Sequence, residues 1–457
     1  MLRFAIGTAI FLAALVAIMV RPYRVPEAAI ALIAGALMVL GGFVAPLAAL
    51  DTLGSEWNVY GFFLGLMIIA ALADQAGIFD ALATLAGRWA GGSARRLFLA
   101  VFLVGVAITA FLSNDATALI LTPIVYTLVT RLRLPPLPFM FACTFIADSA
   151  SFLLPVSNPI NVLVLDAFGG DLGLFWRYLL LPSVVCIALN IAVFALIFRR
   201  ELRLRYEVAA LAGEDSGEQR GTAEDAEDAE AATAASAEIA GRAREGRNAH
   251  YLRATLAGLG LICAGYLLFS ALALPLSFVA LGGSTLLVLI AVAFGRLRWR
   301  RLAGEISWPL FGFITGMFVL VRGVEDLGLT ALVGRGLLAL GQQGALRAVL
   351  VTAAGTALGA NTINNLPMAL VMISALRTLG LPAGAAASMH QPLIYATILG
   401  ADLGPNLTTV GSLATMLWLL ILRRKGLEVS SIQYIKLGLT VVPAMILLGS
   451  LLIWLGV

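Results

Sequence analysis

Long apolar runs alternate with short, arginine-rich segments along the chain. The runs fall near residues 4–20, 27–49, 58–75, 97–130, 137–165 and 175–198, and they resume near 252–270, 276–294, 307–324, 346–379, 389–422 and 433–456. About 20 apolar residues are enough for a helix to cross a bilayer. The pattern therefore predicts an all-α polytopic membrane protein, with the lipid bilayer as its surroundings.

A polar segment at residues 199–251 separates the two sets of runs. It contains the acidic sequence Glu-Asp-Ala-Glu-Asp-Ala-Glu and is rich in alanine, so it cannot bury a core of its own. We expect a flexible cytoplasmic linker there, with a docking site for a partner as the alternative.

Charge agrees with a membrane protein, because the chain is 61% hydrophobic and only 12% charged. The net charge of +4 does not indicate a nucleic-acid partner, since the basic residues lie at the ends of apolar runs, as the positive-inside rule expects. The loop at 45–57 has no basic residue and is predicted to lie outside. The basic clusters then all lie inside, at Arg21–Arg24, Arg88–Arg96, Arg131–Arg133, Arg199–Arg205, Arg296–Arg301 and Arg423–Lys425.

This orientation requires the run at 97–130 to leave and return on the same side. A re-entrant helical hairpin with a polar tip satisfies it, and two tightly connected full spans would satisfy it too. Broken backbone at membrane depth is tolerated where it is enclosed by protein or lines a cavity.

An internal repeat organises the chain. Positions 251 residues apart match at Trp57 and Trp308, Gly61 and Gly312, Gly65 and Gly316, Asp74 and Glu325, Gly77 and Gly328, and Asn114 and Asn365. The first repeat is predicted at 1–198 and the second at 252–457. Each would hold five spans plus a hairpin, at about 97–130 and 346–379. An odd number of crossings makes the repeats inverted, as in many secondary transporters; chance similarity between glycine-rich helices is the alternative.

Polar residues interrupt the apolar runs at four places that the repeat relates. The hairpin tips hold Ser113, Asn114 and Thr117 in the first half and Asn364 and Asn365 in the second. Two broken helices, at about 137–165 and 389–422, hold Ser157, Asn158, Asn161, Asn406 and Thr408. Pro155, Pro159 and Gly404-Pro405 prevent a regular helix there. We interpret these side chains as a substrate-binding pocket.

Three acids in the apolar runs are candidate proton-coupling residues, namely Asp115, Asp148 and Asp402. A carboxyl group in a low-dielectric site can take up and release a proton as access alternates. Helix capping for Asp402, and pairing or packing for Asp148, remain alternatives. Asp74 and Glu325 lie near helix ends and are interpreted as solvated or structural.

The absent motifs narrow the function. The chain has no Gly-x-x-x-x-Gly-Lys-Ser/Thr motif, so energy must come from an ion gradient or a separate subunit. No nucleophile–base or metal-ligand set indicates an enzyme, and no metal or cofactor is expected. Cys143, Cys186 and Cys263 are unclustered and are interpreted as core residues.

Four stretches together resemble the arsenite efflux permeases of the ArsB type, within the ion transporter superfamily. They are Ser113-Asn-Asp-Ala-Thr-Ala-Leu, Phe145-Ile-Ala-Asp with Ser157-Asn-Pro-Ile-Asn, Asn364-Asn-Leu-Pro-Met, and Gly400-Ala-Asp-Leu-Gly-Pro-Asn-Leu-Thr. The resemblance covers nearly the whole chain except 199–251. It implies proton-coupled export of arsenite and antimonite, as neutral hydroxides of trivalent arsenic and antimony, across the bacterial inner membrane.

The resemblance also implies, for some members, a cytoplasmic arsenite-stimulated ATPase as partner. Related carriers couple to sodium and have Ser-Asn-Thr at both tips, whereas this chain has Asp115 in the Thr position. The acid favours proton coupling over sodium coupling. A sodium-coupled or sodium–proton carrier, and a passive channel or ATPase anchor, remain the alternatives.

Overall fold

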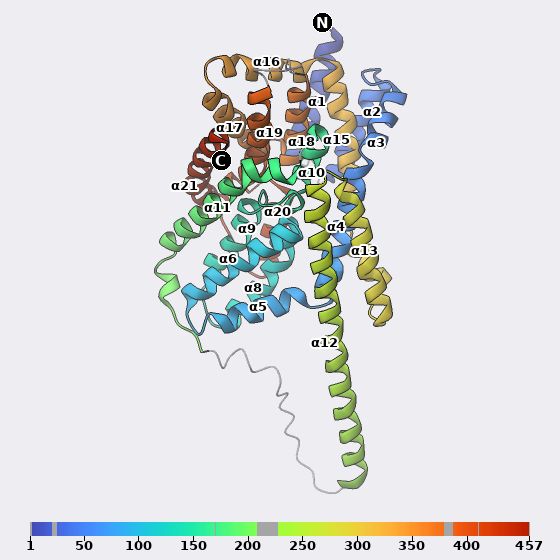
Figure 1. Ribbon diagram of the computed structural model, residues 1–457, viewed down its shortest axis with the longest axis vertical. Coiled ribbons are helices and arrows are strands. Elements are labelled where there is room, and N and C mark those ends of the chain that lie inside the picture. Colours follow the sequence, from blue (N-terminus) through green and yellow to red (C-terminus); the bar gives the residue numbers. More distant parts are fainter. Residues whose placement is uncertain are drawn as a thin grey trace.

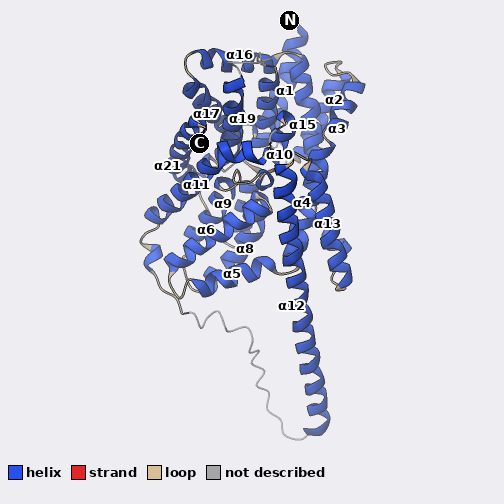
Figure 2. Ribbon diagram, in the orientation of Figure 1, coloured by secondary structure: helices blue, strands red, loops and turns tan. Residues whose placement is uncertain are grey.

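The computed structural model describes residues 2–20, 25–169, 171–207, 227–378, 387–409 and 411–456. These residues form helices and connecting loops, without a β-strand among them (Figure 2). Eight helices of the described part are long and apolar enough to cross a membrane. The predicted all-α polytopic class is confirmed.

The first half contains spanning helices, short helices and one turn of π-helix. The helices are α1 (Leu2–Val20), α2 (Glu27–Leu40), α3 (Pro46–Ser55), α4 (Trp57–Gln75), α5 (Ile78–Trp89), α6 (Ala94–Phe111), α7 (Asn114–Ala116), η2 (Thr117–Leu121), α8 (Thr122–Arg131), α9 (Leu137–Ser149), η3 (Pro155–Ser157), α10 (Pro159–Phe168), α11 (Leu172–Ile197) and η4 (Glu201–Arg203).

The second half has a similar order, with the single helix α18 where the first half has α7, η2 and α8. It contains α12 (Glu227–Ala271), α13 (Leu276–Ala293), α14 (Trp299–Glu305), α15 (Trp308–Asp326), α16 (Leu329–Gln342), α17 (Ala345–Ile363), α18 (Asn365–Arg377), α19 (Ala387–Leu403), η6 (Gly404–Leu407), α20 (Leu413–Arg424) and α21 (Ser431–Leu455).

The helix bounds follow the 251-residue offset of the sequence repeat. α15 begins and ends 251 residues after α4, and α17 begins 251 residues after α6. α1 runs down from the N-terminus in Figure 1, whereas its counterpart α12 runs upward. These observations support the inverted repeat, which remains a prediction together with its two re-entrant hairpins.

The expectation of a flexible linker across 199–251 needs a correction. Residues 227–251 belong to α12, which extends well beyond the helix bundle in Figure 1. The physical reason is that alanine has the highest helix propensity, so a segment too polar to bury a core still forms a helix. Residues 208–226 of this segment lie outside the described residues.

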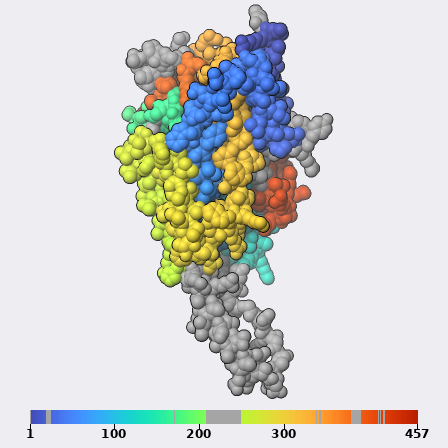
Figure 3. Space-filling model, turned by 90° about the vertical axis from the view of Figure 1, so that its right-hand side faces the viewer, coloured from blue at the N-terminus to red at the C-terminus, as the bar shows by residue number. Residues whose placement is uncertain are grey.

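Small residues hold helices of the two halves together. α4 packs on α13, where the backbone of Ala280 lies against Gly65, and α2 packs on α15, where the backbone of Ala31 lies against Gly316. A side chain at either glycine would collide with that backbone. Glycine at such contacts allows the close approach that membrane helices use for association. Figure 3 shows the resulting interleaved face, with α13 in yellow and α15 in orange beside the blue helices of the first half.

Both predicted broken helices are interrupted. α9 ends at Ser149 and α10 begins at Pro159, with irregular backbone and one turn of 3-10 helix between them. α19 ends at Leu403 and passes through η6 before α20 begins at Leu413. Pro155, Pro159 and Pro405 stand in the first turn of their pieces, where a missing N–H group costs nothing. Proline therefore marks the start of η3, α10 and η6.

Candidate functional site

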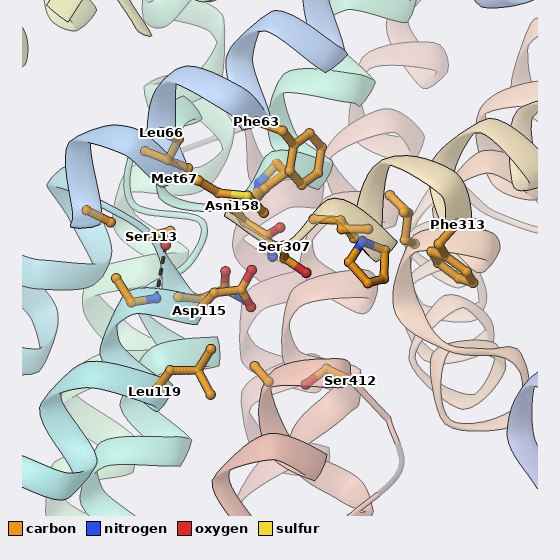
Figure 4. Close-up of a pocket in the computed structure, with 18 of the residues that line it drawn as sticks. Phe63, Leu66, Met67, Ser113, Asp115, Leu119, Asn158, Ser307, Phe313 and Ser412 are labelled. Carbon is orange, nitrogen blue, oxygen red and sulfur yellow. Dashed lines mark hydrogen bonds between the residues drawn. The ribbon is translucent and has the colours of Figure 1, made fainter. Parts of the chain in front are cut away.

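A cavity of about 600 Å³ lies where the two polar tips meet the first broken helix. The polar lining at the tips and breaks comes from Ser113, Asn114 and Asp115 at the first tip, Asn364 and Asn365 at the second, Asn158 at the first break and Ser412 at the second. Figure 4 shows Asp115 near the middle, with Phe63, Leu66 and Met67 on one side of it and Ser412 on the other. Four segments far apart in sequence thus converge.

The first tip is built by local hydrogen bonds. Ser113 caps α7, and its Oγ accepts a hydrogen bond from the Ala116 backbone N–H at 3.0 Å. Thr117 Oγ1 lies 2.7 Å from Thr109 Oγ1 and also donates to the Ser113 carbonyl oxygen at 3.2 Å. The capped turn leaves Asp115 partly exposed to the cavity while its neighbours are buried.

The second tip differs in both backbone and charge. Asn364 has a φ of 74° and a ψ of 155°, a backbone conformation that residues other than glycine rarely adopt. Asn365 Oδ1 accepts a hydrogen bond from its neighbour's N–H, that of Leu366, at 3.0 Å. Leu366 lines the cavity at the position that Asp115 occupies in the first tip. The cavity therefore has an acid on one tip and an apolar side chain on the other.

Two further acids lie buried behind the lining. Asp402 is 1% exposed and its Oδ1 accepts a hydrogen bond from Asn158 Nδ2 at 2.8 Å. Asp148 is 2% exposed and close enough to Asp115 and Asp402 to interact with both electrostatically. Asp148 Oδ2 and Asp402 Oδ2 are buried oxygens without a hydrogen-bond partner among the described residues. Asn158, which touches both the cavity and Asp402, links the lining to this buried pair.

Other residues predicted to bind substrate instead hold the breaks together. The predicted residues that do not line the cavity are Thr117, Ser157, Asn161, Asn406 and Thr408. Their side chains form hydrogen bonds mainly with backbone groups or with neighbouring side chains. Ser157 Oγ donates to the Ala110 carbonyl oxygen, Asn161 Nδ2 to that of Ser151 and Asn406 Nδ2 to that of Phe145, while Thr408 Oγ1 donates to Asn361 Oδ1. Breaking a helix frees backbone groups, and these side chains satisfy or fix them.

Comparison with known proteins decides the family. The citrate transporter family model (CitMHS) matches residues 14–400. An arsenical pump membrane protein of Yersinia enterocolitica is 30% identical, over 84% of this chain and 82% of that protein. A second, from Escherichia coli K12, is 29% identical over the same shares. The chain belongs to this family, among its ArsB-type permeases. The predicted resemblance and a multi-pass location in the bacterial inner membrane are thereby confirmed.

A solved structure supports the fold alone. The YdaH transporter of Alcanivorax borkumensis is 16% identical, with a TM-score of 0.50 over 90% of this chain and 89% of that one. It agrees with the helical membrane fold, and the transporter role of the ArsB-type permease rests on the family match.

One end of this permease's cavity, called its mouth here, is lined by three acids that are not buried, Glu27, Asp74 and Glu305. Arg301 lies 3.7 Å from Asp74 Oδ2 and 2.8 Å from Glu305 Oε1. Asp74 was interpreted from the sequence as solvated or structural, whereas here it lines the cavity as well as contacting Arg301. No basic side chain is among the described residues that line the cavity.

Sequence reasoning missed several lining residues of the permease. Ser412 stands 251 residues after Asn161, directly before the apolar run of α20, so the repeat could have identified it. The apolar wall of Phe63, Leu66 and Met67 gives no such signal, because every spanning helix is apolar. Only the packing of α4 against the tips selects these residues.

Proposed function

We propose that this ArsB-type permease exports trivalent arsenic, as arsenous acid, and also the antimony equivalent, out of the cytoplasm in exchange for protons. The observation that carries the proposal is the cavity between the two tips. It offers neutral hydroxyl and amide groups together with carboxylates, and it has no basic side chain among its described lining residues. The similar proteins named arsenical pump membrane proteins support the same substrate.

Arsenous acid suits such a lining, because it is a small neutral trihydroxide at neutral pH that both donates and accepts hydrogen bonds. Ser113, Asn114, Asn158 and Asn365 supply donors and acceptors of both kinds. Substrate bound by neutral hydrogen bonds is also released easily, whereas thiolate ligands would hold arsenic tightly. No cysteine lines the cavity, and Cys143 and Cys186 are buried elsewhere.

Citrate, the substrate in the family's name, fits this cavity poorly. Citrate carries several negative charges near neutral pH, and the lining presents carboxyl groups of Glu27, Asp74, Asp115 and Glu305. Like charges in a cavity of reduced dielectric repel strongly, and a carboxylate-binding site ordinarily uses arginine. The charge of the lining therefore favours a neutral substrate.

Proton exchange is assigned to Asp115 with Asp148 and Asp402. Asp115 faces the cavity, whereas Asp148 and Asp402 lie behind it, and Asn158 links Asp402 to the lining. We propose that Asp115 is protonated when the cavity faces the outside and releases its proton when the cavity faces the cytoplasm. Substrate would then bind from the cytoplasm while the carboxylates are charged.

The test measures arsenite uptake by proteoliposomes of the purified permease, with the pH gradient and the sodium gradient imposed separately. We expect a gradient that is acidic inside the vesicles to drive concentrative uptake without sodium or nucleotide, and excess citrate not to compete. Uptake that follows the sodium gradient alone would replace proton coupling by the sodium alternative. Uptake that never exceeds equilibrium would indicate a channel.

A further inference from the structure

One buried amide ties three helices together at the end of α4 that lies away from the cavity mouth. Asn58 is 4% exposed, and its Nδ2 donates a hydrogen bond to Asp166 Oδ1, near the end of α10, at 2.7 Å. Its Oδ1 accepts a hydrogen bond from the Ser277 N–H, at the start of α13, at 3.3 Å. A hydrogen bond to a carboxylate is among the stronger kinds. Asn58 thus joins α10 to the α4–α13 pair.

Two charged residues complete this contact. Glu56, just before α4, attracts Arg377 at the end of α18 and repels Asp166. Both α10 and α18 have the cavity at their other end, because Asn158 and Asn365 line it. At the far ends, the Asn58 hydrogen bond therefore holds α10 near α4 against this repulsion, and the attraction between Glu56 and Arg377 holds α18.

The cavity opens toward the opposite end of α4. Met67, Ala70 and Asp74 line it along α4, and Asp74 stands at its mouth with Glu27 and Glu305. Asn58 precedes Asp74 by sixteen residues, which is about 24 Å along a helix. The arginine distribution places the Asp74 end of α4 at the cytoplasm and the Glu56 end outside. The polar contact thus lies on the side where the cavity is closed.

We infer that the Asn58–Asp166 hydrogen bond is a latch that keeps the cavity closed to the outside in this conformation and breaks once in each transport cycle. Alternating access requires α10 to change its position relative to α4 when the outer side opens, and this bond cannot survive that change. The two halves of the chain differ at this contact. The positions 251 residues after Asn58 and Asp166 are Pro309 and Leu417, which cannot form the same bond. This latch therefore has no counterpart at the repeat-related position, and it favours the form that is open to the cytoplasm.

The test uses a cysteine at the cavity as a reporter of access. Met67→Cys is introduced with Cys263→Ala, since Cys143 and Cys186 are buried. Labelling by a membrane-impermeant maleimide is then timed in right-side-out and in inverted vesicles. We expect rapid labelling from the cytoplasmic side and slow labelling from the outside. Asp166→Ala, at an exposed position where folding tolerates substitution, is expected to accelerate outside labelling about tenfold.

The controls separate a latch from a general loss of structure. Asp51→Asn removes an exposed carboxylate of α3 on the same side and is expected to leave outside labelling unchanged. Asn58→Asp combined with Asp166→Asn exchanges donor and acceptor and is expected to restore slow labelling. Unchanged outside labelling in Asp166→Ala, or acceleration that the exchanged pair fails to reverse, would overturn the inference. Labelling is measured without arsenite, so this test can fail or succeed independently of the test of arsenite export.

Discussion

At the scale of single residues, the permease places its acids at different depths. Asp115 meets the cavity directly, whereas Asp148 and Asp402 are buried behind it. A charge buried without a partner is costly, and Asn158 is the group that satisfies one oxygen of Asp402. Asn158, which lines the cavity and donates to Asp402, thus joins the cavity to a buried acid.

Asp115→Asn tests the proton assignment. The amide keeps the size of the side chain but cannot exchange a proton, so we expect a correctly folded protein whose proton-driven arsenite uptake falls at least about tenfold, the effect of about 1.4 kcal/mol. Arsenite uptake down its own gradient is the companion measurement, and Asp51→Asn is the matched control. Proton-driven uptake at the native rate in Asp115→Asn would remove Asp115 from the coupling mechanism.

The Asn158–Asp402 hydrogen bond is expected to stabilise the fold. A double-mutant cycle with Asn158→Ala and Asp402→Ala, each of which removes one partner of the bond, should give a coupling free energy of about 1–3 kcal/mol, because the bond joins a buried amide to a carboxyl group. Thermal unfolding in detergent measures it. Additive effects of the two substitutions would show that the two side chains do not support each other.

At the scale of helices, two pairs set the frame around the cavity. α4 with α13 and α2 with α15 pack through glycine, and the latch residues lie at one end of the first pair. Met67 and Asp74 of α4 line the cavity. Because close packing holds α4 in place, we expect α10 and α18 to move relative to it when the latch opens.

Gly65→Ala tests this packing. The added methyl group would meet the Ala280 backbone, which cannot move aside, and we expect destabilisation by about 1–3 kcal/mol. Gly282→Ala on α13 is the matched control, because nothing lies within 4 Å of its added Cβ. The control should be neutral or stabilising. Equal thermal stability of the two variants would contradict this account of the helix pair.

External pH is expected to act on the latch through Glu56. Burial, and then the charge of Asp166, raise the pKa of Glu56 above its ordinary value of 4.5, and Arg377 opposes them. If opening releases Glu56 to water, the closed form binds the proton more tightly, so a falling pH stabilises the closed form. Because the thiolate fraction of any cysteine falls in acid, outside labelling of Met67→Cys is divided by that of the same cysteine in Asp166→Ala at each pH. We expect this ratio to fall between neutral pH and pH 4.5, and Glu56→Gln to remove the fall. A ratio that rises in acid would reverse the assigned sign.

At the scale of the whole molecule, the two halves interlock rather than stand side by side. α4 of the first half packs on α13 of the second, and α2 packs on α15. The cavity likewise takes one polar tip from each half. Neither half can complete its core or its site alone.

Separate expression of the halves tests this interlocking. Residues 1–207 and 227–457, produced together as two polypeptides, are expected to assemble and transport arsenite. Either piece alone is expected to be degraded, because its glycine-rich faces would have no partner. Membrane abundance and vesicle uptake are the measurements. A first half that accumulates to native abundance by itself would contradict an interlocked core.

The sequence by itself determined the class, the repeat offset and the places where helices break. Apolar run length, arginine placement and proline are local signals, so they predict spans, breaks and the polar tips without knowledge of packing. Ser113, Asn114, Asp115, Asn158, Asn364 and Asn365 were predicted as site residues in this way, and they line the cavity.

Only the tertiary structure decided which polar residues face the cavity and which support it. Ser157, Asn161, Asn406 and Thr408 have the same residue types as the lining, but their bonds go to nearby backbone or side chains. The apolar wall and the Asn58–Asp166 latch depend on helices distant in sequence coming together. The pattern of apolar and polar residues along the chain predicts which face of each helix is buried. Which other helix covers that face depends on packing over the whole fold.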